Sequence, residues 1–319
     1  MMAPSVSEAK ILYVCGKTGS GDGAQIFDRK LLKALIERGI AVSALHPLRL
    51  RALRLPLWRG RLQELNEINA QVRHSKQHGT RIVLSHEVFF GIAHKTPVDL
   101  LIVHNYMPCF SFPGRRLLEL YYRVGSRKFL GQAFANARAI AFLSQRDQRH
   151  AVADFPQIAN RSHVLPPPPH PYEFGTGGYD VIHISGSDAW LPKRLSRLTQ
   201  DDLYKIRSAG FGISDFKQQA APAFGLIPDR FTVGFKLKLM QMLYCGDAIA
   251  SLSDICEEIT ALAPDYPWWR EVASVDEAVE WFSELRGNSA WRAHCIDNVR
   301  LKLPNWAEIA CKVNEILDR

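Results

Sequence analysis

The chain has 319 residues, of which 47% are hydrophobic and 23% charged, and its formal net charge is +8. These values exclude a disordered, collagenous or coiled-coil chain, and the length predicts two domains. Residues 1–170 carry 24 basic and 11 acidic side chains, whereas residues 171–319 carry 16 and 21. A basic first half indicates an anionic partner, and nucleic acid, an anionic membrane surface and a phosphorylated substrate all satisfy that condition.

The predicted elements of the first half alternate strands with helices. In chain order they are a strand at 10–15, a helix at 24–38, and strands at 40–45, 81–85, 99–104 and 139–144. The strands are short apolar runs, and the helix has apolar residues three and four positions apart. Strand, helix and parallel strand in this order are typical of a Rossmann-like, doubly wound α/β domain.

A proline-rich run at 166–171 (PPPPHP) follows, and it predicts a stiff polyproline II linker. We place the domain boundary there, so that the domains are 1–168 and 169–319. The second domain is predicted to contain strands at 179–185, 223–227 and 248–252 and a closing helix at 305–317. The expected fold is α/β, with two Rossmann-like domains facing across a cleft. For the C-terminal helix, packing back on the first domain is an alternative to packing within the second.

The turn at 16–23 (GKTGSGDG) joins the first strand to the first helix. It matches neither a Walker A loop nor the GxGxxG fingerprint of dinucleotide-binding folds. Its backbone at Gly19, Gly21 and Gly23 can approach an anion or a sugar, and Asp22 is a candidate general base. A turn that binds no ligand is the alternative.

Polar residues follow two of the predicted strands at their carboxyl ends. His86 and Glu87 come directly after one strand, and His104 and Asn105 after the next. Ligands of open α/β sheets bind at this edge, where an imidazole or carboxylate can accept a proton from a hydroxyl nucleophile. We therefore select Glu87 and His104 as candidate bases, with His86 and Asn105 beside the acceptor. A purely structural role for each histidine is the alternative.

Two basic segments interleave arginine with apolar and aromatic residues. The first, 49–61, contains five arginines and Trp58, and the second, 115–128, contains four arginines, Lys128 and two tyrosines. In the first segment, arginines beside a tryptophan are typical of proteins that bind an anionic bilayer surface. A solvated loop is the alternative for the first segment, because Pro56 interrupts any long amphipathic helix.

The segment 234–251 (GFKLKLMQMLYCGDAIAS) is predicted to be a helix followed at once by a buried strand. Lys236 and Lys238 lie in the first turn of that helix, where ammonium groups and free backbone N–H groups together favour a diphosphate. Gln241 follows Lys238 by nearly one turn, so both can face one ligand. Lysines that are merely solvated are the alternative.

This segment resembles the donor-domain pattern GFGLPxLEAMACGxPVIAS of the GT-B glycosyltransferases, which use nucleotide-sugar donors. The likeness extends to LSHEVFFGIAH, LLIVHNYMP, FLSQRDQR, YDVIHISGSDAWLPKR and NWAEIACKVNEIL. It implies an acceptor-binding first domain, a donor-binding second domain and catalysis between them. It also implies that Lys193 and Arg194 join the donor phosphates, that Gln241 stands at the ribose, and that neither a metal nor a cofactor is needed.

The chain departs from that family at two points. Retaining members carry two glutamates with seven residues between them, and Val233 and Gln241 occupy those places here. The pair Lys238 and Gln241 is instead similar to bacterial polysaccharide glucuronosyltransferases, which invert. Only thirty residues, 193–222, separate two predicted strands. The second domain is therefore expected to be shortened, since a βα unit takes about 30 residues.

The leading hypothesis is a metal-independent hexosyltransferase that moves a sugar from a UDP- or GDP-sugar to a glycan or lipid-linked acceptor. Its setting would be bacterial-type polysaccharide or glycoconjugate synthesis. Widely spaced cysteines and the lack of a bilayer-long apolar stretch or a secretion signal predict a cytoplasmic protein. The basic first domain would fit an anionic acceptor at the inner membrane face. The alternative is a degenerate homologue that binds a glycan or nucleotide or acts as a scaffold. Specific nucleic-acid binding ranks last, because no recognisable module accompanies the charge.

Overall fold

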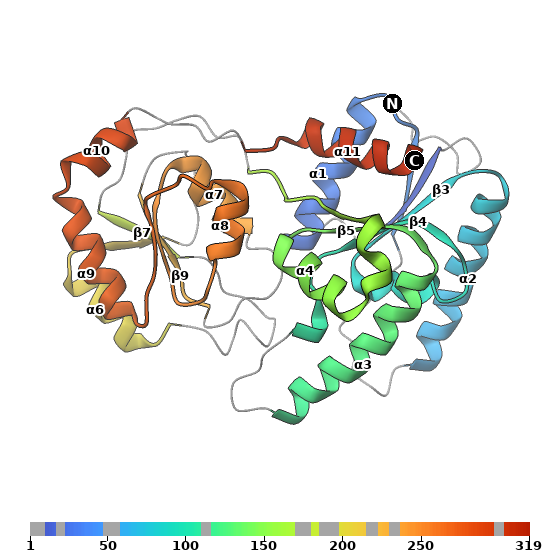
Figure 1. Cartoon of the computed structure of the whole chain (residues 1–319), viewed down its shortest axis with the longest axis horizontal. Coiled ribbons are helices and arrows are strands. Elements are labelled where there is room, and N and C mark those ends of the chain that lie inside the picture. The colour runs from blue at the N-terminus through green and yellow to red at the C-terminus, as the bar shows by residue number, and fades with distance from the viewer. Residues whose placement is uncertain are drawn as a thin grey trace. The chain divides into compact units, whose positions relative to one another are not determined.

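The computed structural model describes residues 10–16, 23–46, 58–109, 116–169, 180–184, 198–214, 223–229, 237–296 and 303–319. The chain divides into two compact units. The first contains Met1–Phe110, Leu117–Pro167 and Pro304–Arg319, and the second contains Ser111–Arg116 and Pro168–Leu303. Each unit is an α/β structure built on a parallel sheet (Figure 1).

The sheet of the first unit has six parallel strands in the order β2-β1-β3-β4-β5-β6. Their bounds are β1 (Ile11–Val14), β2 (Val42–Leu45), β3 (Arg81–Ser85), β4 (Val98–Val103), β5 (Ala137–Phe142) and β6 (Ser162–Val164). Tyr13 of β1 pairs with Ala44 on one side and Val83 on the other. The chain runs from β1 to β2 and then crosses back to β3, so the strand order reverses between β1 and β3. Ligands of doubly wound sheets bind at the carboxyl ends beside such a reversal.

Helices cover both faces of this sheet. They are α1 (Gly23–Glu37), α2 (Trp58–Gln77), α3 (Arg116–Ala135), α4 (Gln145–Asp154) and α11 (Trp306–Asp318), with 3-10 turns η2 (Glu87–Ile92), η3 (Met107–Cys109) and η4 (Pro156–Arg161). Alternate strand residues point to opposite faces. Leu12 and Leu84 pack with Val72 of α2 and Phe134 of α3 in one core cluster. The opposite face of β1 and β3 meets α1.

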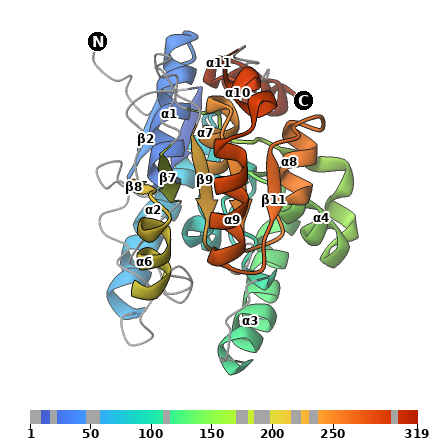
Figure 2. The same ribbon diagram turned by 90° about the vertical axis from the view of Figure 1, so that its left-hand side faces the viewer.

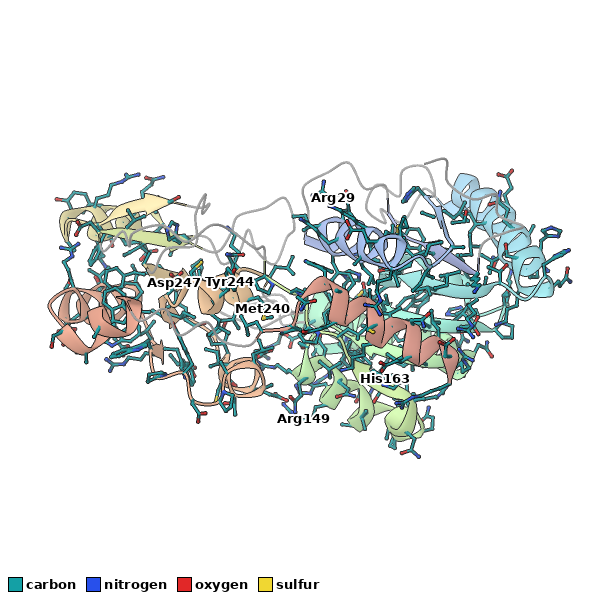
Figure 3. The ribbon with its side chains drawn as sticks, turned by 90° about the horizontal axis from the view of Figure 1, so that it is seen from above. Arg29, Arg149, His163, Met240, Tyr244 and Asp247 are labelled. Carbon is teal, nitrogen blue, oxygen red and sulfur yellow. The ribbon has the colours of Figure 1, made fainter. Side chains whose placement is uncertain are left out.

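Although it ends the chain, α11 belongs to the first unit and lies along α1 (Figure 3). An Asn305–Glu308 capping box begins the helix, and its apolar stripe is buried. Trp306 packs edge-on against Phe27 of α1, with ring centroids 5.5 Å apart. Lys312 Nζ donates to the Val164 carbonyl oxygen at 2.9 Å. Burial of the apolar stripe explains why this helix joins the first unit.

The second unit has a five-stranded parallel sheet in the order β11-β10-β9-β7-β8. Its strands are β7 (Val181–Ile184), β8 (Gly212–Ser214), β9 (Phe224–Ile227), β10 (Ala248–Ser251) and β11 (Trp269–Glu271). Its helices are α6 (Gln200–Ser208), α7 (Leu237–Cys245), α8 (Cys256–Leu262), α9 (Val275–Arg286) and α10 (Ser289–Ile296). The order reverses between β7 and β9, as it does between β1 and β3.

Aromatic packing forms the core on one face of the second sheet. Phe224 of β9 stacks on Trp291 of α10 and lies against Phe282 of α9, at centroid distances of 4.7 and 4.8 Å. Figure 2 shows α9 in front of β9. Helices α7 and α8 pack on the other face, where Leu239, Met242 and Ile259 share an apolar cluster with Ile227. Both faces of the sheet are therefore covered, as parallel sheets require.

None of the described helices combines the length and the apolar character that a membrane crossing needs.

Gly246 ends α7 with a φ of 75°, the left-handed conformation that favours glycine. Its N–H donates to the Leu243 carbonyl, and the Asp247 N–H donates to the Met242 carbonyl. We expect Gly246→Ala to lower the free energy of unfolding by about 1 kcal/mol, because a Cβ strains this conformation. Urea denaturation followed by circular dichroism measures the change.

The matched control is Gly125→Ala, which lies within α3 where an added Cβ would meet no atom within 4 Å. There the free energy of unfolding should rise by about 0.5–1 kcal/mol, since alanine favours a helix. Equal shifts for the two variants would contradict the explanation.

Candidate functional site

The carboxyl edge of the first sheet gathers polar side chains from neighbouring strands. Cys15 and Gly16 follow β1, His46 follows β2, His86 follows β3 and His104 follows β4. Because β1 and β3 flank the reversal of strand order, this edge is where the fold places a ligand.

A buried carboxylate joins these strands to α1. Asp28 of α1 is 1% exposed, and its Oδ1 accepts hydrogen bonds from Tyr13 Oη at 2.8 Å and Ser85 Oγ at 2.5 Å. Burial, followed by the nearby Asp28 carboxylate, raises the pKa of Tyr13 and also the pKa of the Cys15 thiol. Both groups therefore remain protonated at neutral pH, and Cys15 is no thiolate nucleophile.

The same network fixes the protonation of His104. Its Nε2 lies 2.9 Å from Ser85 Oγ. Since Ser85 gives its hydroxyl hydrogen to Asp28, Nε2 must carry the hydrogen that Ser85 accepts. Burial, followed by the charge of His86, lowers the pKa of His104 well below its ordinary value. His104 is 4% exposed and its ring packs edge-on against Phe27. It is therefore a neutral, buried imidazole with a set tautomer.

His86 is the more accessible of the two histidines, with a third of its side chain exposed. Its φ is 80°, and it alone among the described non-glycine residues has a positive φ. Its ring lies 5.5 Å from the ring of His104. Histidine adopts this left-handed conformation more readily than most residues, but at an energetic cost, and such strained positions cluster at functional sites. The strained backbone directs His86 to the edge of the sheet.

Glu87 connects the two strand ends. The residue is 3% exposed, and its Oε1 accepts the backbone N–H of Asn105 at 2.6 Å. Its Oε2 lies 3.5 Å from Nδ1 of His86. The carboxylate thus positions both the chain after β4 and the His86 ring, so the structure brings His86, Glu87, His104 and Asn105 together.

His46 holds the start of the glycine-rich turn. Its Nδ1 lies 3.1 Å from the Gly16 carbonyl oxygen and 3.4 Å from Cys15 Sγ. A carbonyl oxygen only accepts, so Nδ1 is the donor. His46 comes from the end of β2 and was not selected from the sequence.

In the second unit, a lysine side chain lies at the end of β7, where the strand order reverses. Lys238, in the first turn of α7, donates from Nζ to the Ile184 carbonyl at the end of β7, at 3.2 Å. Gln241 lies on the same helix, and its Nε2 donates to Cys245 Sγ at 3.4 Å. Figure 3 shows Met240 and Tyr244 of this helix. A cation and a helix N-terminus therefore lie at the carboxyl edge of the second sheet.

Several predicted site residues fall outside the described residues. They are Gly19, Gly21, Asp22, Lys193, Arg194 and Lys236. Gly23 is the first residue of α1. No group of three or more histidine, cysteine, aspartate or glutamate side chains suited to a metal ion occurs within the described segments. Metal independence remains a prediction.

Comparison with known proteins identifies the fold. The chain matches no protein-family model and no curated protein sequence. Sucrose-phosphate synthase from Thermosynechococcus elongatus matches with a TM-score of 0.64 and 12% identity, over 98% of each chain. WaaG, a glycosyltransferase involved in lipopolysaccharide biosynthesis, gives 0.61 and 13%, over 96% of this chain and 99% of that chain. This chain has the GT-B fold.

A third GT-B structure agrees. A UDP-forming α,α-trehalose-phosphate synthase from Burkholderia xenovorans gives a TM-score of 0.55 and 12% identity, over 98% of this chain and 99% of that chain. The predicted α/β fold with two Rossmann-like domains is thereby confirmed, whereas the cleft between the domains and the shortening of the second domain stay predictions. Structural likeness at such low sequence identity establishes the fold alone. The activity therefore has to be argued from the site residues.

Sequence reasoning missed Asp28, Ser85 and Tyr13. Asp28 carried a usable signal, because it lies four residues after Ala24 and three before Leu31 and so belongs to the apolar face of α1. A carboxylate on a buried helix face requires a partner. Ser85 and Tyr13 gave no comparable signal, since each fits a buried strand without any polar contact.

The neutral state of His104 predicts a pH dependence of stability. The unfolded chain binds a proton near pH 6.5, whereas burial lowers the pKa of His104 in the folded state. The free energy of unfolding should therefore fall as pH drops below about 6.5, by at most about 1.4 kcal/mol per pH unit. Urea denaturation between pH 5 and 7 measures the slope.

His104→Gln, which keeps a donor for Ser85, should flatten that slope. His163, whose pKa is lowered by burial and then by Lys312, leaves a smaller slope of the same sign in both proteins. An unchanged slope in the variant would contradict the assignment.

Proposed function

We propose that the chain is a glycosyltransferase that moves a sugar from a nucleotide diphosphate sugar, UDP- or GDP-linked, to a glycan or lipid-linked acceptor. The single observation that carries the proposal is the position of Lys238 in a GT-B fold. Its ammonium lies at the end of β7, beside the reversal of strand order in the second sheet.

The donor diphosphate suits the residues around α7. The first N–H groups of a helix have no intrahelical partner, and the helix dipole adds partial positive charge there. Lys238 contributes a full charge at the same end. We assign Lys193, Arg194 and Lys236 to the same phosphates on the family resemblance, and Gln241 to the ribose. These charges would neutralise the departing diphosphate without a metal ion.

The acceptor is assigned to the carboxyl edge of the first sheet. In the transfer, the bond between the sugar C1 and the diphosphate oxygen breaks, C1 bonds to an acceptor hydroxyl oxygen, and the proton of that hydroxyl passes to a base at this edge. His86 is a partly exposed imidazole at this edge, so we propose that it contacts the acceptor and accepts that proton. Glu87 and His104, both buried, position it. Asp22 and the glycine-rich turn complete the acceptor side in this proposal.

The setting proposed is polysaccharide or glycoconjugate synthesis at the cytoplasmic face of a membrane. Its support is the charge of residues 1–170, which contain 24 basic and 11 acidic side chains. A lipid-linked diphosphate acceptor and an anionic membrane surface would both be attracted to such a half.

A catalytically degenerate, nucleotide- or glycan-binding protein is the second candidate. The observation that favours it is Gln241, which stands where the family resemblance implies a glutamate and donates to Cys245 Sγ. An amide has a single acceptor oxygen, whereas a carboxylate has two, one for each ribose hydroxyl. Binding without transfer would identify this function.

Calorimetric titration with UDP, GDP, CMP and dTDP tests the donor assignment. We expect one diphosphate to bind selectively. Lys238→Ala should weaken that binding by about 1–3 kcal/mol, because a charge-assisted contact to phosphate is lost. Lys205→Ala removes the same charge from α6 of the same unit, where Lys205 pairs with Asp276, and should leave the affinity unchanged. Equal affinities for the two variants would overturn the phosphate assignment.

His86→Asn tests the acceptor side. Asparagine tolerates the left-handed backbone, so the fold should persist while the imidazole is removed. With the donor class that the titration identifies, the transfer rate should fall by at least about 100-fold. His78→Asn, at an exposed histidine after α2, should transfer at the original rate. Full turnover by His86→Asn would clear His86 of a role in the reaction.

A further inference from the structure

Helix α3 carries an exposed apolar ridge, defined by Leu117, Leu120 and Val124. These side chains are 85%, 56% and 61% exposed. In the described part of the chain only two other large apolar side chains are exposed, Ile36 on α1 and Tyr204 on α6, and each stands alone on its helix. Isolated exposed apolar residues are normal, whereas three on one helix need a physical explanation.

The ridge is a single face of the helix. Its members follow one another at spacings of three and four residues, which places them on one side. Further along α3, Leu130, Ala133 and Phe134 are buried in the core of the first unit. Figures 1 and 2 show the N-terminal end of α3 projecting beyond the sheet of its unit. The helix is thus anchored by its C-terminal half, and its N-terminal half presents the ridge to solvent.

Basic residues accompany the ridge. The helix contains four basic side chains and one acidic one, Glu119. Arg127 and Lys128 come three and four residues after Val124, so they continue the same side of the helix, and both are exposed. Arg127 also pairs with Asp154 of α4, which holds it at this surface. An apolar ridge with adjoining cations has the chemistry of a helix that lies in an anionic bilayer interface.

We propose that the α3 ridge inserts into the headgroup region of a bilayer that contains anionic lipids. Apolar side chains would leave water for the acyl boundary, while Arg123, Arg127 and Lys128 would meet lipid phosphates. A second copy of the chain is a poorer occupant, because pairing two ridges would bring two basic sets together. The inference deepens the proposed function, since it supplies the surface from which a lipid-linked acceptor would be reached. The evidence for the inference itself is the exposure and the charge of the α3 side chains.

Vesicle flotation with the full chain tests the proposal. We expect the protein to float with phosphatidylcholine vesicles that contain about one third phosphatidylglycerol, and to bind pure phosphatidylcholine roughly tenfold less. Binding to the anionic vesicles should weaken as salt rises, because the lipid charge is screened. Binding that is equal on both vesicles, or absent from both, would overturn the proposal.

The double variant Leu120→Glu/Val124→Glu should reduce binding to anionic vesicles by roughly tenfold, since it places carboxylates in the interface. Ile36→Glu on α1 is the matched control and should bind as the unaltered chain does. Circular dichroism melts confirm that each variant is folded. Undiminished binding by the double variant would overturn the proposal, as would a dimer, seen by light scattering, that only the double variant dissociates.

Nucleotide titration of the same preparations separates the two proposals. The double variant should bind its nucleotide diphosphate with unchanged affinity. If the original chain floats with anionic vesicles but binds no nucleotide, the proposed function fails and the α3 ridge stands. If it binds nucleotide but no vesicles, the ridge fails and the function stands.

Discussion

The hydrogen bonds to the Asp28 carboxylate are the interaction on which the carboxyl edge of the first sheet depends. Asp28 lies on α1, and its donors Tyr13 and Ser85 lie on β1 and β3. Those two strands flank the reversal of strand order, so one buried acid fixes the helix against both. Without it, two buried hydroxyls would lose their acceptor, at a cost of about 1–3 kcal/mol each. The tautomer of His104 follows from the same carboxylate through Ser85.

Contacts with β4 and the chain after it hold the strained backbone at His86. Backbone strain persists only where surrounding contacts determine the conformation. Here the His86 N–H donates to the Ile102 carbonyl at 3.1 Å, and Glu87 is held by the Asn105 N–H. Of the two histidines that follow β3 and β4, His86 is therefore partly exposed and His104 is buried and neutral. The roles proposed for the two histidines, contact for His86 and positioning for His104, rest on this difference in burial, which their similar places in the sequence do not reveal.

The second sheet also has a reversal of strand order, but the side chains at its carboxyl edge are different. Its strand order reverses between β7 and β9, and Lys238 reaches the end of β7 from α7. Gly225 of β9 makes this possible, because an added Cβ would lie 2.7 Å from Met242 Sδ, so α7 packs closely on the strand. One edge thus offers a buried, neutral imidazole, a partly exposed imidazole and a buried acid network, and the other offers a cation. The proposed function uses that contrast, with an acceptor hydroxyl at the first edge and a donor diphosphate at the second.

The sequence by itself determined the alternation of strands and helices, because burial on both faces makes a parallel strand a continuous apolar run, as at 81–85. It also determined that His86, Glu87, His104 and Asn105 share one edge, because parallel strands end together. It did not reveal β8 or β11, which are three residues long and partly exposed. Only the tertiary structure decided that Asp28 joins β1 to β3, that His104 is buried and that α11 returns to the first unit. Those outcomes depend on packing between segments far apart in the chain, which local periodicity does not encode.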